Sequence, residues 1–145
     1  MDTSGPNLCR ILQEDGWEII YTIVVPDEGE QIITQLRHCT DVLRANLILT
    51  TGGTGFSPRD ITPEATLEVI QRQTPGISEA MRAESMRITP KGCLSRGVSG
   101  ICNESLIINL PGSKKASEEN IRTVLPALKH GVDMLRSNGS ANCGG

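Results

Sequence analysis

Two short apolar runs, each followed by a glycine-containing turn and a helical pattern, constrain the fold of this chain most strongly. The runs are "NLILTT" at 46–51 and "SLIIN" at 105–109. Continuously apolar strands of this length are typical of a sheet that helices cover on both faces. Ligands of such sheets bind outside the carboxyl ends of the strands. The sequence therefore predicts two candidate anion-binding turns along one edge of one sheet.

The rest of the chain alternates strand-like and helix-like segments, which predicts one α/β domain with a mostly parallel sheet. Further strands are expected at 17–25 and near 95–102. Helical spacing of apolar residues predicts helices at 6–15, 27–44, 63–73, 77–87 and 121–135, and Pro126 should kink or split the last one. We expect the domain to cover residues 1–136 and to be followed by a disordered tail at 137–145.

Composition excludes several classes of protein. The formal net charge is −3, with acidic and basic residues interleaved, whereas a nucleic-acid-binding protein usually presents a basic face. No apolar run reaches the roughly 18 residues of a membrane-spanning helix, and the start of the chain does not resemble a secretory signal. The five cysteines contain no C-x-x-C pair, which argues against a structural zinc site and predicts a reducing, cytoplasmic setting.

The turn after the first apolar run is rich in glycine but matches neither of two common phosphate-binding fingerprints. No G-K-[ST] follows the glycines, and Pro58 replaces the third glycine of the dinucleotide fingerprint. A glycine-rich nest remains, in which backbone N–H groups converge on an anion. Its candidate binding residues are Thr51, Gly52, Gly53, Thr54 and Gly55. An ordinary strand-to-helix turn is an equally good interpretation of the glycines alone.

Asp60 strengthens the ligand interpretation. The next helix is expected to be capped by Thr62 with Pro63 in its first turn, so Asp60 is not needed as a cap. A carboxylate beside a phosphate is repulsive unless a cation lies between them, and Mg²⁺ takes one or two carboxylates plus substrate phosphates. Arg59 is a candidate binding residue next to it. The alternative is a solvated pair between Asp60 and Arg59.

Asp27 and the second turn supply further candidates on the same sheet edge. Asp27 follows a predicted strand, but with Glu30 three residues later it also resembles the start of a capping box. The second turn, "LPGSKKAS", offers Pro111, Gly112, Ser113 and Lys114 ahead of a helix, although a lysine pair is often simply solvated. Ser95 and Arg96 of "LSRG" are candidate additional binding residues. His38 and His130 are expected to be ordinary helix residues.

Three stretches together resemble the molybdopterin adenylyltransferases: bacterial MogA, the plant G-type domain and the gephyrin G domain. They are "LILTTGGTGFSPRDITPEAT", "LSRGVSGI" and "LIINLPGSKKAS…VLPALKHGVDMLR", and the resemblance covers residues 2–136. It implies a three-layer α/β fold, usually a homotrimer. It also implies Mg²⁺-dependent transfer of AMP from ATP to the terminal phosphate of molybdopterin, with release of pyrophosphate.

The same resemblance assigns roles to residues and partners. Asp27 and Asp60 match the family's two important aspartates and are expected to handle the metal and the phosphates. The loops Thr51 to Gly55 and Pro111 to Lys114 are expected to bind the substrates, and a molybdenum insertase is a possible partner. Two alternatives remain: a molybdopterin-binding or assembly module without turnover, and another phosphate-metabolite enzyme on the same fold.

One departure from the family concerns the start of the chain. Relatives begin with a strand before the "DTSGP" helix, and that strand is internal to their sheet. Here Met1 and Asp2 lead directly into the helix. Two neighbouring strands are therefore expected to lack hydrogen-bond partners.

Overall fold

The computed structural model describes residues 3–137 and places the two apolar runs side by side as parallel strands. β1 (Leu47–Thr51) and β4 (Ser105–Leu110) pair along the full length of β1, from Leu47 opposite Leu106 to Thr51 opposite Leu110. Every residue of β4 is buried, as expected for a strand covered on both faces. Because parallel strands end at the same edge of a sheet, the turns that follow β1 and β4 meet there.

On its other side β4 pairs with an antiparallel strand, so the sheet is mixed. β3 (Ser99–Cys102) joins β4 through a two-residue turn in which Asn103 has a φ of 53°, and β2 (Arg72–Gln73) pairs with β3. The strand order is β1-β4-β3-β2. The expectation of a mostly parallel sheet holds only for β1 and β4. A two-residue turn can join only antiparallel strands, so β3 and β4 must be antiparallel.

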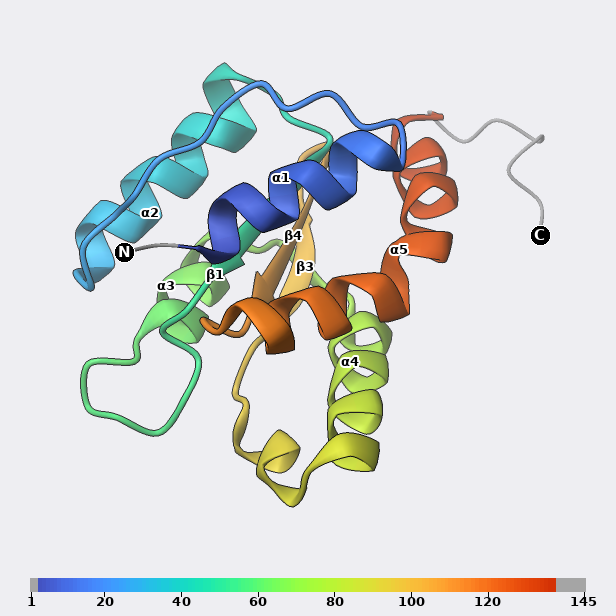
Figure 1. The fold of residues 1–145 in the computed structure, drawn as a ribbon. Helices are drawn as coiled ribbons and strands as arrows, with labels where there is room; N and C mark the ends of the chain where they lie inside the picture. Colours follow the sequence, from blue (N-terminus) through green and yellow to red (C-terminus); the bar gives the residue numbers. More distant parts are fainter. Residues whose placement is uncertain (1–2, 138–145) are drawn as a thin grey trace.

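Helices cover both faces of the sheet, which confirms the three-layer α/β architecture (Figure 1). α1 (Ser4–Glu14), α4 (Pro75–Ile88) and α5 (Lys114–Arg136) pack on one face, around Leu106 and Ile108 of β4. α2 (Gly29–Arg37) and α3 (Thr62–Val69) pack on the other face, around Ile48 and Ile107. The alternation of side chains along β4 thus divides the core between two helical layers.

Several helix boundaries differ in detail from the sequence prediction. The helix predicted at 27–44 consists of α2 and a π-helical segment, η1 (His38–Val42), and a 3₁₀ segment, η2 (Pro90–Leu94), precedes β3. Thr62 is the first residue of α3 and makes no cap bond, so its predicted N-cap role is wrong. α5 continues through Pro126 and bends along its length in Figure 1, as the predicted kink requires. Residues 138–145 of the predicted tail lie outside the described residues.

The strand predicted at 17–25 does not form. These residues run extended but pair with no strand among residues 3–137, and β1 pairs with β4 alone. Trp17 and Ile19 pack against the layer that contains α1 and α5, whereas Ile20 and Val24 are 55% and 81% exposed. β-branched residues favour a strand only where a neighbour supplies hydrogen bonds. The observation agrees with the expectation that two neighbouring segments lack partners.

The burial of Ile107 and the exposure of Val24 predict very different losses of stability when each is replaced by alanine. Ile107→Ala removes a side chain with 0% exposure and should lower the free energy of unfolding by about 2–5 kcal/mol in urea titrations. Val24→Ala, at 81% exposure, is the matched control and should change it by less than about 0.5 kcal/mol. A comparable loss in both variants would contradict the solvent exposure of Val24.

Candidate functional site

The two predicted turns contact each other through their backbones. Gly52 N–H donates to the Leu110 carbonyl oxygen at 3.0 Å, which extends the β1–β4 ladder into the turns. A Cβ atom on Gly112 would lie 3.2 Å from Gly52 Cα, and Gly52 has a φ of 89°. The close approach favours glycine at position 112, and the positive φ favours glycine at position 52. The expectation that both turns lie together on one sheet edge is therefore confirmed.

Backbone conformation and close contacts also explain why glycine occurs at positions 53 and 55 of the first turn. Gly53 has a φ of 69°, and a Cβ atom there would overlap Thr62 Oγ1. Thr62 N–H donates to the Gly53 carbonyl at 3.1 Å, which folds the turn back onto the start of α3. A Cβ atom on Gly55 would lie 2.9 Å from Asp60 Oδ2. The turn is thus a tight, backbone-lined structure.

The two aspartates have different partners. Arg59 Nη2 lies 3.8 Å from Asp27 Oδ2, so Arg59 pairs with Asp27 and not with Asp60 as the alternative interpretation had it. Asp27 is not a cap, because Glu28 occupies the N-cap position of α2 and makes no side-chain cap bond. Asp60 Oδ2 accepts from Ser57 N–H at 3.0 Å. Both carboxylates therefore have oxygens that no helix cap uses.

The donor set around these aspartates fits a magnesium ion that arrives with its substrate. Within residues 3–137 there is no group of three or more His, Cys, Asp or Glu residues that could hold a metal ion. Mg²⁺ commonly binds through one or two carboxylates plus phosphate oxygens and water. Asp27 and Asp60 match that requirement, whereas a resident metal held by protein alone would need more ligands.

At the second turn, the Ser113 hydroxyl is engaged by the helix. Ser113 is the N-cap of α5, and its Oγ accepts from Ala116 N–H at 3.1 Å. The Gly112 carbonyl accepts from Ser4 Oγ at 2.6 Å, which brings the start of α1 to the same place. The exposed Lys114 side chain makes no ion pair within the described residues. An anion here would meet Lys114 and the N–H groups of the first turn of α5.

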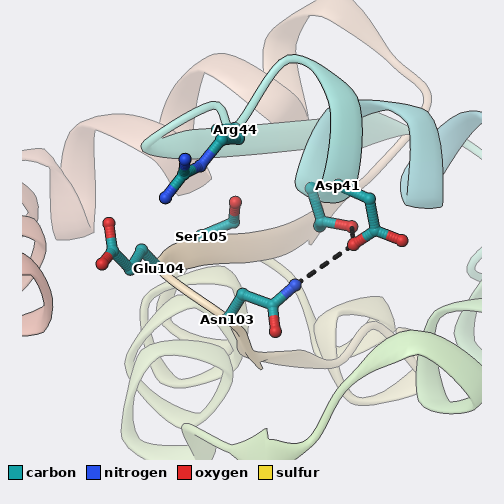
Figure 2. A pocket seen from close by; sticks show the side chains of 6 residues that line it. Asp41, Arg44, Asn103, Glu104 and Ser105 are labelled. Atoms are coloured by element: carbon teal, nitrogen blue, oxygen red, sulfur yellow. Dashed lines mark hydrogen bonds between the residues drawn. The ribbon is translucent and has the colours of Figure 1, made fainter.

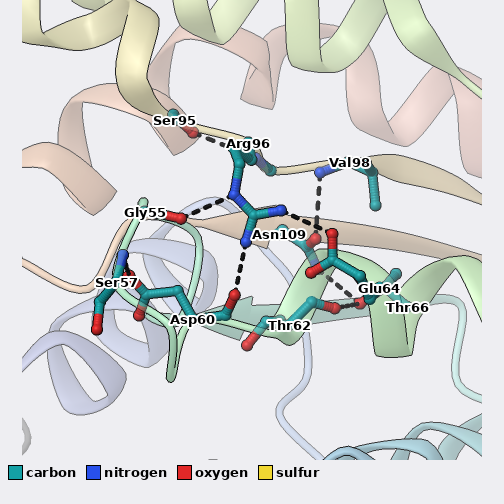
Figure 3. A network of polar contacts seen from close by, with 11 residues as sticks. Gly55, Ser57, Asp60, Thr62, Glu64, Thr66, Ser95, Arg96, Val98 and Asn109 are labelled. Carbon is teal, nitrogen blue, oxygen red and sulfur yellow. Dashed lines mark hydrogen bonds and ion pairs between the residues drawn. The ribbon is translucent and has the colours of Figure 1, made fainter.

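Arg96 lies beside the first turn, but its guanidinium group faces the protein (Figure 3). It donates to the Gly55 carbonyl at 2.8 Å and to the Asp60 carbonyl at 2.6 Å, and it pairs with Glu64 at 2.7 Å. The hydrogen bond from Arg96 lowers the pKa of the Glu64 carboxyl below its ordinary value. Ser95 Oγ accepts from Gly97 N–H at 3.3 Å.

Asn109, which the sequence patterns did not single out, connects β1, α3 and the segment before β3. Its side chain is buried at the carboxyl end of β4 and donates to Thr50 Oγ1 at 2.9 Å and Thr66 Oγ1 at 3.0 Å. Asn109 Oδ1 accepts from Val98 N–H at 3.1 Å. The available signal was a polar residue that ends an otherwise apolar run, since buried polar side chains need partners.

A hollow of about 280 Å³ lies at the opposite edge of the sheet, where β1 and β4 begin. Figure 2 shows Arg44 and Asp41 facing Asn103 across it, with Asn103 Nδ2 donating to Asp41 Oδ1 at 3.1 Å. The hollow contains none of the predicted site residues.

Comparison with known proteins places this geometry in a family. The family described as "Probable molybdopterin binding domain" matches residues 1–130. The molybdopterin adenylyltransferase of Helicobacter pylori is 43% identical over 140 residues, which are 94% of this chain and 79% of that protein. Gephyrin of Dictyostelium discoideum is 45% identical over 150 residues, 94% of this chain and 20% of gephyrin. The crystal structure of the molybdopterin biosynthesis enzyme MoaB from Thermus thermophilus superposes with a TM-score of 0.90 at 42% identity, covering 94% of this chain and 86% of that one.

The chain belongs to this molybdopterin-binding family, which confirms the resemblance drawn from its motifs. It spans 20% of the Dictyostelium gephyrin and 22% of the Drosophila melanogaster protein cinnamon, but most of the bacterial enzyme's length. The chain therefore matches most of a short relative and one part of two much longer ones.

The contact between Gly53 and Thr62 predicts a difference between two glycine substitutions. Gly53→Ala should destabilise the domain by about 1–3 kcal/mol more than Gly16→Ala in urea titrations, because its Cβ overlaps Thr62. Gly16 also has a positive φ, of 95°, but a Cβ atom there meets open space, so it controls for backbone strain alone. Equal losses would show that the close contact is absent in solution.

Proposed function

We propose that this chain is a molybdopterin adenylyltransferase, which transfers AMP from ATP to the terminal phosphate of molybdopterin and releases pyrophosphate. The backbone contact between the two glycine turns is the observation that carries this proposal. Adenylyl transfer between a nucleotide and a phosphorylated pterin needs two anionic groups side by side. Two contacting turns, each able to direct N–H groups at an anion, provide such a place.

The reaction forms a bond between a molybdopterin phosphate oxygen and the α-phosphorus of ATP, and breaks the bond from that phosphorus to the bridging oxygen of pyrophosphate. The residues of the chain contribute by binding and by orienting the two phosphates. Thr51 to Gly55 and Pro111 to Lys114 are the proposed binding loops. Asp27 and Asp60 would hold Mg²⁺, which when bound offsets the negative charge of the phosphates.

A second candidate function, a binding or assembly module without turnover, is favoured by one observation. Asp27 follows the extended segment 17–25, which no described strand holds in place, and its side chain is 50% exposed. Its contact with Arg59, at 3.8 Å between exposed groups, is weak. A chain in this state would bind phosphates at the glycine turns while one metal-holding carboxylate remained loosely positioned.

The oligomeric state and the cellular compartment are parts of the same proposal. We propose a homotrimer that acts in the cytoplasm on small-molecule substrates and passes its product to a molybdenum insertase. Among residues 3–137 no helix is long and apolar enough to cross a membrane. Cys9, Cys39, Cys93 and Cys102 are free thiols.

Product formation tests the function directly. Purified chain, Mg-ATP and molybdopterin should yield adenylylated molybdopterin by mass spectrometry, with pyrophosphate released only when both substrates are present. Pterin binding by the folded chain without product would favour the second candidate function. Nucleotide hydrolysis in the absence of pterin would instead indicate another phosphate-metabolite enzyme on this fold.

The proposed metal role of Asp60 predicts that its substitution lowers turnover but leaves molybdopterin binding almost unchanged. Asp60→Asn keeps an oxygen that can accept from Ser57 N–H but removes the charge, so kcat should fall on the order of 100-fold. The affinity for molybdopterin should change by less than about threefold. Asp41→Asn, at the opposite edge of the sheet, is the matched control and should leave kcat unchanged. Equal loss of binding and turnover in Asp60→Asn would contradict the metal role.

A further inference from the structure

The loop between β1 and α3 makes few bonds of its own. Within residues 54–60, Asp60 N–H donates to the Ser57 carbonyl at 2.9 Å, Ser57 N–H donates to Asp60 Oδ2, and Arg59 N–H donates to Ser57 Oγ at 3.4 Å. Figure 1 shows this loop projecting from the edge of the sheet. Asp60 lies at its end. The position of Asp60 relative to the glycine turns therefore depends on contacts that reach the loop from elsewhere.

Arg96 makes those contacts at both ends of the loop. Its backbone N–H donates to the Thr54 carbonyl at 2.8 Å. Its guanidinium donates to the carbonyls of Gly55 and Asp60 through two different nitrogens, while the third nitrogen bonds to Glu64 at the start of α3 (Figure 3). One side chain thus joins the beginning of the loop, its end and the helix that follows.

The segment that carries Arg96 is itself anchored to the core. Two residues further on, Val98 bonds to the buried Asn109 side chain, which also holds Thr50 of β1 and Thr66 of α3. Arg82 of α4 donates to the Gly97 carbonyl at 2.8 Å. The segment that carries Arg96 is therefore also held by contacts outside the loop.

We propose that Arg96 is a positioning residue for the reaction, which fixes loop 54–60 and with it Asp60. This proposal rests on the proposed function. Each of the three guanidinium nitrogens already donates to a protein acceptor, which favours a role through the loop. The planar fork of arginine serves three acceptors together, whereas a lysine ammonium in the same place is a single point charge on a flexible stem.

Arg96→Lys tests the proposal through two independent measurements. The first is hydrogen exchange without substrate, in which backbone amides of 54–60 should exchange at least about tenfold faster while those of β4 stay unchanged. The second is steady-state kinetics, in which kcat should fall about 10- to 100-fold while the KM values change less than about threefold. Arg87→Lys is the control, because Arg87 pairs with Glu84 on α4, away from the loop, and should alter neither measurement.

Each outcome decides the question. Faster exchange confined to 54–60 with a fall in kcat supports the positioning role. A rise in KM with unchanged exchange would make Arg96 a substrate contact and overturn the proposal. A variant that fails to fold would also overturn it, because Arg96 would then stabilise the whole domain. If the wild-type chain makes no product, the proposed function fails, and the exchange measurement alone still decides whether Arg96 fixes the loop.

Discussion

The hydrogen bond from Gly52 N–H to the Leu110 carbonyl is the interaction on which the candidate site depends. It extends the parallel ladder of β1 and β4 past the last strand residues and brings two turns into backbone contact. The approach leaves little room for a side chain on Gly112, and Gly52 has a positive φ that favours glycine. Since α3 and α5 begin shortly after these turns, the starts of both helices lie on the same edge of the sheet.

Charge explains why such an edge needs more than backbone N–H groups. Two phosphorylated substrates would repel each other, and Asp27 and Asp60 would add negative charge. Lys114, which is exposed at the second turn, and a magnesium ion held by carboxylates and phosphates would offset these charges. Arg96 contributes differently, because its charge is directed at Glu64 and at two loop carbonyls.

The sequence predicted the local features well and the long-range ones poorly. β1, β4, the helices and the contact between the glycine turns follow from apolar periodicity and the chemistry of glycine. The segment 17–25 has every local mark of a strand, but strand formation requires a neighbour, which local patterns do not reveal. The pairing of Arg59 with Asp27 and the network of Asn109 depend on residues far apart in the sequence, so no spacing rule indicated them.

If the two contacting turns hold phosphate groups side by side, one pyrophosphate should span both, and amide NMR of the isotopically labelled chain during a titration with magnesium pyrophosphate measures this. The account predicts that the amides of Gly52, Gly53 and Gly55 shift together with those of Gly112, Ser113 and Lys114, with one dissociation constant for both turns. Shifts confined to one turn, or separate saturation of the two, would contradict it.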